Sequence, residues 1–251
     1  LGQLDQASPE VIFALLEILG DSDGEVWWGA ARSLGQLGQA GPQVIPALLE
    51  ALGDNNHDVR AVVARYLGRL GQASPEVISG LLEALDDDHW WVREKAAESL
   101  GQLGQASSRV ISALLKALDD DEEAVRRAAV ASLGQLGQAS PQVISGLLEA
   151  LDDDKWWVRR AAAWGLGQSG QPSPQVISAL LEALSDDEEP VRQAAAWGLG
   201  ELDQASPQII SALLEALDDD HWWVRHAAVD SLGQLGQASP QVISALLEAL
   251  D

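Results

Sequence analysis

The chain has 251 residues, 47% of them apolar, so it is long enough and hydrophobic enough to fold around a sizeable core. Its 39 acidic and 15 basic residues give a net charge of −24, which repels nucleic acid and anionic lipid and suits a basic or neutral partner. The absence of cysteine excludes disulfides and thiolate metal sites, and no apolar run approaches the roughly 18 residues of a membrane span.

The sequence repeats itself every 33 residues. A Val-Arg dipeptide, a Leu-Gly dipeptide and a proline each recur with this period, and Ser108 takes the place of the proline in one unit. The period divides the chain into a partial unit at 1–7, seven full units over 8–238 and a partial unit at 239–251. We therefore expect a single repeat array over 1–251.

The sequence of each repeat predicts two helices, and the unit at 140–172 serves as the example. Ser140 is a natural helix cap, and the apolar residues after it recur at helical spacing up to Leu151, which predicts a first helix. Three aspartates then interrupt the pattern and place negative charge at the start of a second helix. We expect this second helix to run from about Lys155 to Gln168 and to stop near Gly170.

A single helical hairpin of this kind cannot bury its apolar face. Stacking successive hairpins does so, and the frequent alanine and glycine of the second helix allow the helices to approach closely. The predicted fold is therefore all-α, a right-handed α-solenoid of two-helix repeats with a period of 33 residues.

The string Asp-Asp-x-x-x-Val-Arg-x-Ala-Ala-x-x-x-Leu-Gly, as at 120–134, resembles the short HEAT-like repeat of bacterial proteins. That group includes the phycobilisome-lyase-type HEAT repeats and the sensor arrays of some large prokaryotic signalling ATPases. The string is also similar to artificial α-helicoidal repeat proteins. The resemblance covers nearly the whole chain and implies that first helices line the convex side and second helices the concave, binding side. It says little about function, because such folds host many functions.

The resemblance also implies a structural role for the arginine of each Val-Arg pair. In this family that arginine commonly pairs with an aspartate from the loop between the two helices, which builds a ladder along the array. Trp27 stands in place of the arginine in the first full unit, so we expect the ladder to break there. The expected ladder residues are Arg60, Arg93, Arg126, Arg159, Arg192 and Arg225.

Variation between units gathers at five positions of the second helix. At helical spacing these positions share one face, opposite the inward-facing valine and alanine. We expect this face to be exposed and to bind the partner, and we assign Glu94 to it along with the equivalent residues of other units. In the unit at 140–172 the five positions are Trp156, Trp157, Arg160, Trp164 and Gln168.

The chain has ten tryptophans but one tyrosine and one phenylalanine, and nine tryptophans map to this face. Trp27 is the exception. Two interpretations stay open: a tryptophan at the start of a second helix packs the seam between repeats, or the tryptophans form an aromatic stripe for a partner. The candidate partner-binding residues are Trp28, Trp90, Trp91, Trp156, Trp157, Arg160, Trp164, Trp197, Trp222, Trp223 and His226.

The sequence shows no distinct set of catalytic residues. Asp-Asp-Asp-His occurs at 86–89 and 218–221, but Glu122 and Lys155 replace the histidine in other units, and helix capping explains the aspartates. Serine, histidine and aspartate recur with the scaffold, so no nucleophile and base stand out. We therefore expect no metal, no cofactor and no enzymatic activity.

The predicted function is a non-enzymatic scaffold that binds a basic or apolar protein or peptide, and neither nucleic acid nor membrane. Three alternatives stay open: a fragment of a larger sensor, an array that self-associates head to tail through its cut repeats, or a bilin-lyase-like subunit gripping a tetrapyrrole between aromatic side chains. The composition does not fix the compartment, and a cytoplasmic location is favoured.

Overall fold

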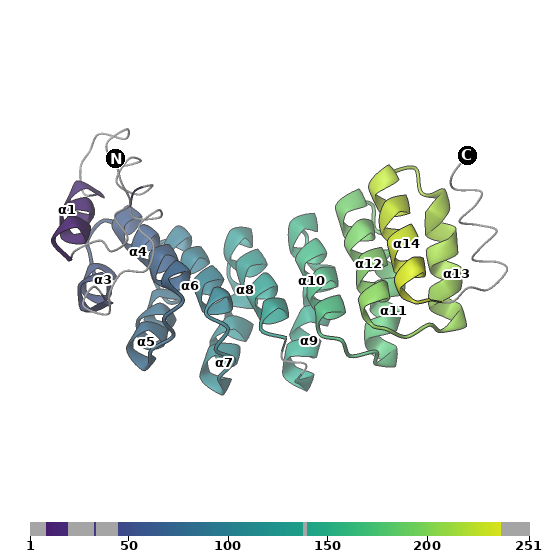
Figure 1. Ribbon diagram of the computed structural model, residues 1–251, viewed down its shortest axis with the longest axis horizontal. Coiled ribbons are helices and arrows are strands. Elements are labelled where there is room, and N and C mark those ends of the chain that lie inside the picture. The colour runs from purple at the N-terminus through teal and green to yellow at the C-terminus, as the bar shows by residue number, and fades with distance from the viewer. Residues whose placement is uncertain (1–8, 20–32, 34–44, 138–139, 237–251) are drawn as a thin grey trace. The chain divides into compact units, whose positions relative to one another are not determined.

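The computed structural model describes residues 9–19, 33, 45–137 and 140–236 (Figure 1). Every regular element in these ranges is a helix, which confirms the all-α class, and none is long and apolar enough to cross a bilayer. The chain forms two compact units, residues 1–132 and 133–251. The single array over 1–251 and its right-handed sense stay predictions.

The first unit contains the helices before residue 133, with the last of them running across the boundary (Figure 1). From α4 onward they alternate between second and first helices of the repeats. Their bounds are α1 Pro9–Leu19, α3 Ile45–Ala51, α4 His57–Leu70, α5 Pro75–Ala84, α6 Trp90–Gln102, α7 Ser108–Lys116, the 3₁₀ turn η2 Ala117–Asp119 and α8 Glu123–Gln135.

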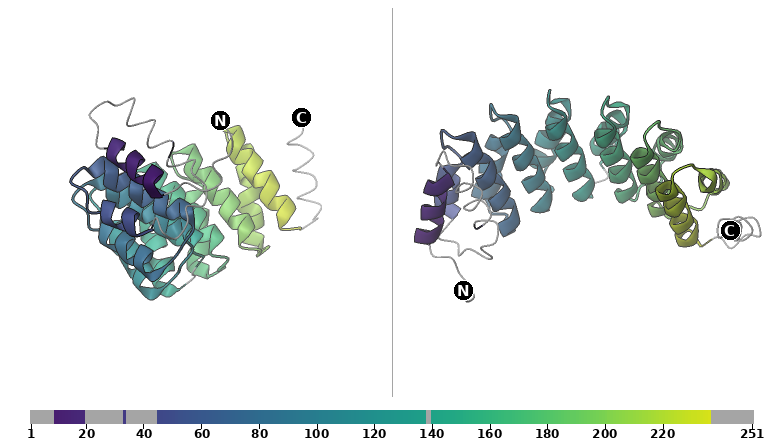
Figure 2. Two further views of the ribbon diagram at one scale, coloured as in Figure 1. Left: turned by 60° about the vertical axis from the view of Figure 1, so that its left-hand side comes forward. Right: turned by 90° about the horizontal axis from the view of Figure 1, so that it is seen from above.

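The second unit holds three further repeats in chain order (Figures 1 and 2). The first helix of a repeat often ends in a 3₁₀ turn before the inter-helix loop. The bounds are α9 Pro141–Glu149, η3 Ala150–Asp152, α10 Trp156–Gln168, α11 Pro174–Ala183, α12 Glu189–Glu201, α13 Pro207–Glu215, η4 Ala216–Asp218 and α14 Trp222–Gln234.

Helix ends follow the signals that the sequence carries. Ser140 is extended, and its hydroxyl accepts the backbone N–H of Val143 at 3.3 Å, while proline occupies the first turn. Gly170 follows α10 with φ 59°, a left-handed conformation that glycine adopts without strain. Asp203 takes the same place after α12 with φ 49°, the one non-glycine residue with positive φ in the described part of the chain.

The aliphatic positions expected to face inward form the core of each repeat. In the repeat that starts at Ser140, Val143 and Leu147 of α9 are buried, and so are Val158 and Leu166 of α10. This arrangement confirms the apolar stripes read from the periodicity. Because each stripe escapes water only against its neighbours, the stacking of repeats supplies most of the hydrophobic stabilisation.

The second helices of a unit pack against one another more extensively than the first helices do. Small residues make this possible in the second unit, where a Cβ atom built on Gly167 of α10 would lie 2.5 Å from the Cα atom of Gly198 on α12. Ser231 of α14 replaces the glycine in the next repeat, and its hydroxyl donates to the carbonyl oxygen of Ala196 at 3.0 Å. A larger side chain at this position of the repeat would force the second helices apart.

The first unit uses the serine version of the same contact. Ser99 of α6 donates to the carbonyl oxygen of Ala64 on α4, and Ser132 of α8 donates to that of Ala97 on α6, both at 2.9 Å. A Cβ atom built on Gly68 would lie 2.5 Å from the Ser99 hydroxyl oxygen. One side of every such contact is therefore a glycine, and the serine hydroxyl is satisfied by a helix carbonyl.

We predict that Gly167→Ala lowers the free energy of unfolding by about 1–3 kcal/mol, because the added methyl group collides with backbone that has no room to move. Gly233→Ala is the matched control: it occupies the same column on α14, and its Cβ atom would meet no described atom within 4 Å. We expect it to be neutral or to stabilise by up to about 1 kcal/mol, since alanine favours helix. Urea denaturation followed by circular dichroism measures both, and equal effects would contradict the packing model.

Candidate binding surface

Within each unit, arginine side chains link repeats to their successors at the inter-helix loops. Arg159 donates from Nε and Nη2 to the two carboxylate oxygens of Asp186, 27 residues later, at 2.7 and 2.8 Å. Its Nη1 donates to the carbonyl oxygen of Asp153 at 2.9 Å. The same bidentate pairing joins Arg60 to Asp87, Arg93 to Asp120 and Arg192 to Asp219.

The remaining ladder arginines hold their own loops. Arg126 and Arg225 donate from Nη1 to the carbonyl oxygens of Asp120 and Asp219, at 3.0 and 2.8 Å. Trp27, where we expected the ladder to break, lies outside the described residues. Guanidinium groups engaged in this way hold the inter-helix loops.

The ladder carboxylates have perturbed acidities. Burial alone would raise the pKa of Asp186, but the hydrogen bonds from Arg159 and from the backbone N–H of Glu188 outweigh it and hold the pKa below its usual value. In return, the hydrogen bond to Asp186 raises the pKa of Arg159. The charged pair is therefore the stable state of this loop at neutral pH.

The face opposite the packed side of the second helices is the surface that varies between repeats. The structure leaves some of its predicted residues exposed and covers others in part, and Trp28 lies outside the described residues. Trp91, Trp156, Trp157 and Trp197 are partly buried. The exposed members are Trp90, Arg160, Trp164, Trp222, Trp223 and His226.

Two pairs of tryptophans stack on this face in the second unit. Trp164 of α10 and Trp197 of α12 occupy equivalent positions in adjacent repeats, and their rings lie 3.5 Å apart at an interplanar angle of 7°. Trp222 and Trp223 at the start of α14 stack at 3.5 Å and 29°. Trp164 is 45% exposed and Trp222 is 51% exposed, so both pairs present aromatic surface to solvent.

The third pair of the unit behaves differently. Trp156 and Trp157 of α10 meet edge to face, with centroids 5.4 Å apart, and both side chains are partly buried. This burial favours the seam-packing interpretation for Trp156 and Trp157 and the exposed-stripe interpretation for Trp222 and Trp223. The two interpretations therefore divide between the pairs.

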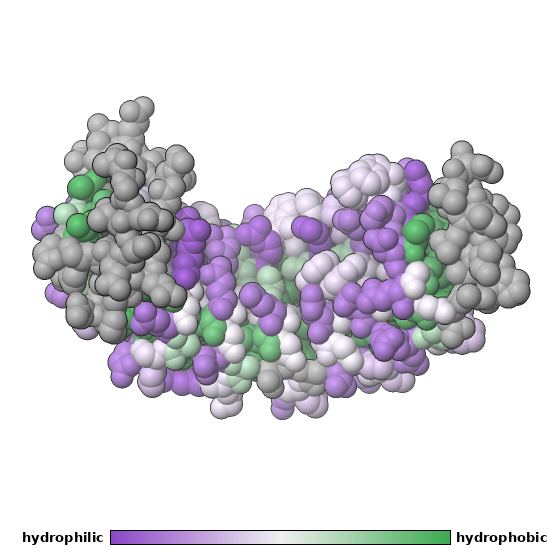
Figure 3. Space-filling model, viewed as in Figure 1, coloured by the Kyte–Doolittle hydropathy of each residue, from purple (hydrophilic) through white to green (hydrophobic). Residues whose placement is uncertain are grey.

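Carboxylates, histidines and polar side chains lie on the same face as the stacked pairs, and Arg160 precedes Trp164 by one helical turn. The Nδ1 atom of His221 lies 3.5 Å from a carboxylate oxygen of Glu189, and that of His226 lies 3.2 Å from one of Asp230. Glu201 accepts a hydrogen bond from the side-chain amide of Gln234 at 3.0 Å. The face thus combines aromatic rings with carboxylates, in keeping with the mostly polar surface in Figure 3.

Glu94 corrects the assignment of this face. We placed it among the exposed positions, but its side chain is buried. Arg127 of α8 reaches back across one repeat to Glu94 at 3.0 Å, and Lys95 lies 3.2 Å from its other oxygen. The long Arg127 side chain covers the carboxylate, which is why helical position alone misjudged its exposure.

The histidine of the first Asp-Asp-Asp-His string belongs to a ring stack that the sequence did not suggest. His89 stacks on His57 at 3.7 Å, and the two are 32 residues apart, one short of the repeat period, so a comparison at the period misses them. Asp87 accepts the backbone N–H of His89 at 2.9 Å, but the residue that caps α6 is His89 itself, whose Nδ1 accepts the backbone N–H of Trp91 at 3.3 Å, so the expected capping by the aspartates is wrong at this helix. No trio of described histidine, aspartate or glutamate residues is arranged to hold a metal ion.

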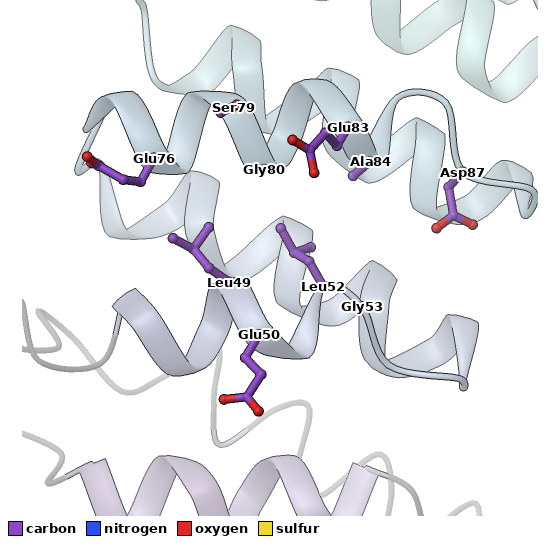
Figure 4. Close-up of a pocket in the computed structure, with 10 residues that line it drawn as sticks. All are labelled: Leu49, Glu50, Leu52, Gly53, Glu76, Ser79, Gly80, Glu83, Ala84 and Asp87. Atoms are coloured by element: carbon purple, nitrogen blue, oxygen red, sulfur yellow. The ribbon is translucent and has the colours of Figure 1, made fainter.

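Shallow acidic grooves lie between consecutive first helices, a feature that the sequence analysis missed. The groove between α3 and α5 has a volume of about 500 Å³ (Figure 4). Leu49 of α3 and Leu52, just after that helix, point toward α5, where Gly80 leaves room for them, and Glu76 and Glu83 line the same groove. A groove of about 710 Å³ separates α9 from α11.

Family models of HEAT repeats match the chain over 1–68, 45–134, 111–200 and 177–251. The chain belongs to the HEAT repeat family. This membership confirms the expected solenoid of two-helix repeats. Among curated proteins, none matches the chain.

Solved structures share this HEAT repeat fold. YibA of Escherichia coli has a TM-score of 0.71 at 22% identity, and the match covers 99% of each chain. The complex of CpcE and CpcF of phycocyanin lyase from Nostoc sp. PCC7120 gives 0.56 at 24% identity over 96% of this chain and 93% of that chain. An engineered protein gives 0.53 at 19% identity over 95% and 71%. At these identities the likeness shows the fold alone.

We predict that the HEAT repeat ladder stabilises the chain at neutral pH and fails in acid. The folded-state pKa of Asp186 is below its unfolded value of about 3.9. Its contribution is therefore complete above that value and is lost as the pH falls through the lower, folded-state pKa. Asp186→Asn should cost about 1–3 kcal/mol at pH 7 and progressively less below about pH 4.

Asp187→Asn is the control for this prediction, because Asp187 is the exposed neighbour and offers only its backbone carbonyl to Arg192. We expect a change within about 0.5 kcal/mol at all pH values. Chemical denaturation between pH 3 and pH 7 measures both variants. A penalty for Asp186→Asn that does not shrink in acid would show that the charged pair is not its cause.

Proposed function

We propose that this HEAT repeat chain is a non-enzymatic scaffold whose second-helix face binds a protein or peptide. The observation that carries the proposal is the exposed tryptophan surface of the second unit, made by Trp164, Trp197, Trp222 and Trp223, which we call the Trp face. Tryptophan is a favoured anchor of protein interfaces, and large exposed aromatic groups are unusual on a surface with no partner.

The energy available at the Trp face supports this role. Burying a whole tryptophan removes about 150–250 Å² from water, worth about 25 cal/mol per Å². Trp164 and Trp223 are each 45% exposed, so each leaves on the order of 2 kcal/mol to be gained when a partner covers it. Several such residues on adjacent helices suffice to anchor an interface of moderate affinity.

The roles of the polar residues support a non-enzymatic function. Ser140 caps a helix, Ser231 donates to a helix carbonyl, and Asp186 pairs with Arg159. These three side chains, each of a type that could serve as nucleophile or base, are thus engaged in the scaffold. The alternative of head-to-tail self-association depends on 1–7 and 239–251, which lie outside the described residues.

Selection from a displayed library of random peptides tests the proposal. Peptides selected on the wild-type chain are then measured against a variant with Ala at Trp164, Trp197, Trp222 and Trp223. We expect affinity to fall at least about tenfold, which corresponds to about 1.4 kcal/mol, with an unchanged far-ultraviolet spectrum.

A matched control changes three exposed residues of the first helix α11, as Gln175→Ala, Ser178→Ala and Glu182→Ala. These substitutions leave the Trp face intact, so the selected peptides should bind the control as they bind the wild type. Peptides that bind the Trp-face variant as tightly as the wild type would refute the proposal.

A further inference from the structure

The stacked indoles of Trp164 and Trp197 form a flat aromatic platform. Their rings are nearly parallel, at 7°, and lie 3.5 Å apart, so nothing fits between them. Trp164 is nevertheless 45% exposed, which leaves ring surface of the stack open to solvent. An indole face carries negative electrostatic potential and attracts a cation laid over it.

Carboxylates that lack a lysine or arginine partner stand around this platform. Glu201 lies one helical turn after Trp197 on α12, and it accepts a hydrogen bond from the neutral side-chain amide of Gln234. Asp230 occupies the position of Trp197 in the next repeat, and within the described chain it pairs with His226 alone. The platform therefore combines aromatic faces with two carboxylates that no described lysine or arginine pairs with.

The first unit shows how the chain neutralises carboxylates on this face, where Glu98 occupies the position of Asp230 and Glu94 that of Gln193. There Glu94 and Glu98 are covered by Arg127 of the following repeat, at 3.0 and 4.0 Å, and Lys95 lies 2.9 Å from Glu98. The residue of α12 at the position of Arg127 is the uncharged Gln193. Arg160 holds the same position on α10, one helical turn before Trp164, but among the described residues no ion pair joins it to Glu201 or Asp230, so these two carboxylates lack the arginine partner that Glu94 and Glu98 have.

We propose that the Trp face of the second unit binds a basic segment of another protein through an arginine. Its guanidinium lies flat on the Trp164–Trp197 stack and pairs with Glu201 or Asp230. Arginine fits better than lysine because its planar, weakly hydrated group stacks on an aromatic ring while its N–H groups still reach a carboxylate. The net charge of −24 attracts such a segment from a distance. This inference rests on the proposed function, that the Trp face is a binding surface.

The repeat geometry sets the spacing of the basic residues. Packed helices lie about 8–10 Å apart, and a chain in the polyproline II conformation advances about 3.1 Å per residue with three residues per turn, so every third side chain faces the array and about three partner residues span one repeat. A segment that crosses α10, α12 and α14 in turn then presents a basic side chain to each repeat when every third residue is basic. The last of these reaches the exposed stack of Trp222 and Trp223.

A set of labelled nine-residue peptides tests the inference on the full chain. Each has glycine and serine as spacers and carries arginine, lysine or citrulline at every third position. Fluorescence anisotropy gives the dissociation constants. We expect the arginine peptide to bind with a strong dependence on salt, the lysine peptide several-fold more weakly, and the uncharged citrulline peptide at least about tenfold more weakly.

Variants locate the site. Glu201→Gln combined with Asp230→Asn should weaken the arginine peptide about tenfold, and Trp197→Ala should do the same. Trp197→Phe keeps an aromatic face with less risk to folding and should recover part of the affinity. Trp90→Ala is the matched control, since Trp90 is 40% exposed but belongs to the first unit, and it should change the affinity less than twofold.

Several results would overturn the inference: equal binding of arginine and citrulline peptides, equal loss in Trp90→Ala and Trp197→Ala, or no binding of the arginine peptide at all. The last result separates the inference from the proposed function. If library-selected peptides of other chemistry still lose affinity for the Trp-face variant, the Trp face binds partners and only its preference for arginine is wrong. If those peptides lose nothing either, both proposals fail.

Discussion

The close approach of successive second helices is the constraint on which the rest of the structure depends. Gly167 lies against Gly198 with no room for a methyl group, and Ser231 fits only because Gly200 lies opposite it. These contacts fix the spacing of the repeats. At that spacing Arg159 reaches Asp186 in the inter-helix loop of the next repeat, and Trp164 of α10 stacks on Trp197 of α12. The packing of the second helices, the arginine–aspartate ladder and the Trp164–Trp197 stack thus all depend on one distance between backbones.

The opposite face of each second helix takes no part in these stabilising contacts. Stability comes from buried aliphatic side chains, small residues at the helix contacts and charged pairs at the loops, none of which uses the positions of Trp222, Trp223 or Asp230. Substitution at these positions leaves the scaffold intact. For example, equivalent positions of two successive repeats hold Trp197 and Asp230. A repeat protein can therefore alter what it binds without altering how it folds.

The helices and the buried apolar stripes were predictable because they depend on the helical spacing of apolar residues, which recurs in successive 33-residue repeats. The burial of Glu94 was not, because it depends on how far Arg127 extends across a neighbouring repeat. The stack of His57 on His89 departs from the period by one residue, and the different burial of the Trp156 and Trp222 pairs arises from side-chain packing between repeats. Sequence patterns identify which face varies, whereas the reach of individual side chains decides what that face exposes.

Native-state hydrogen exchange tests the central packing claim most directly. Helix α12 is flanked by α10 and α14 through the small-residue contacts, so its amides should exchange only through opening of the stack. We predict that they are the slowest to exchange in the second unit, slower than those of the first helices α11 and α13. Exchange in α12 as fast as in α13 would contradict the claim that the contacts between second helices hold the repeats together.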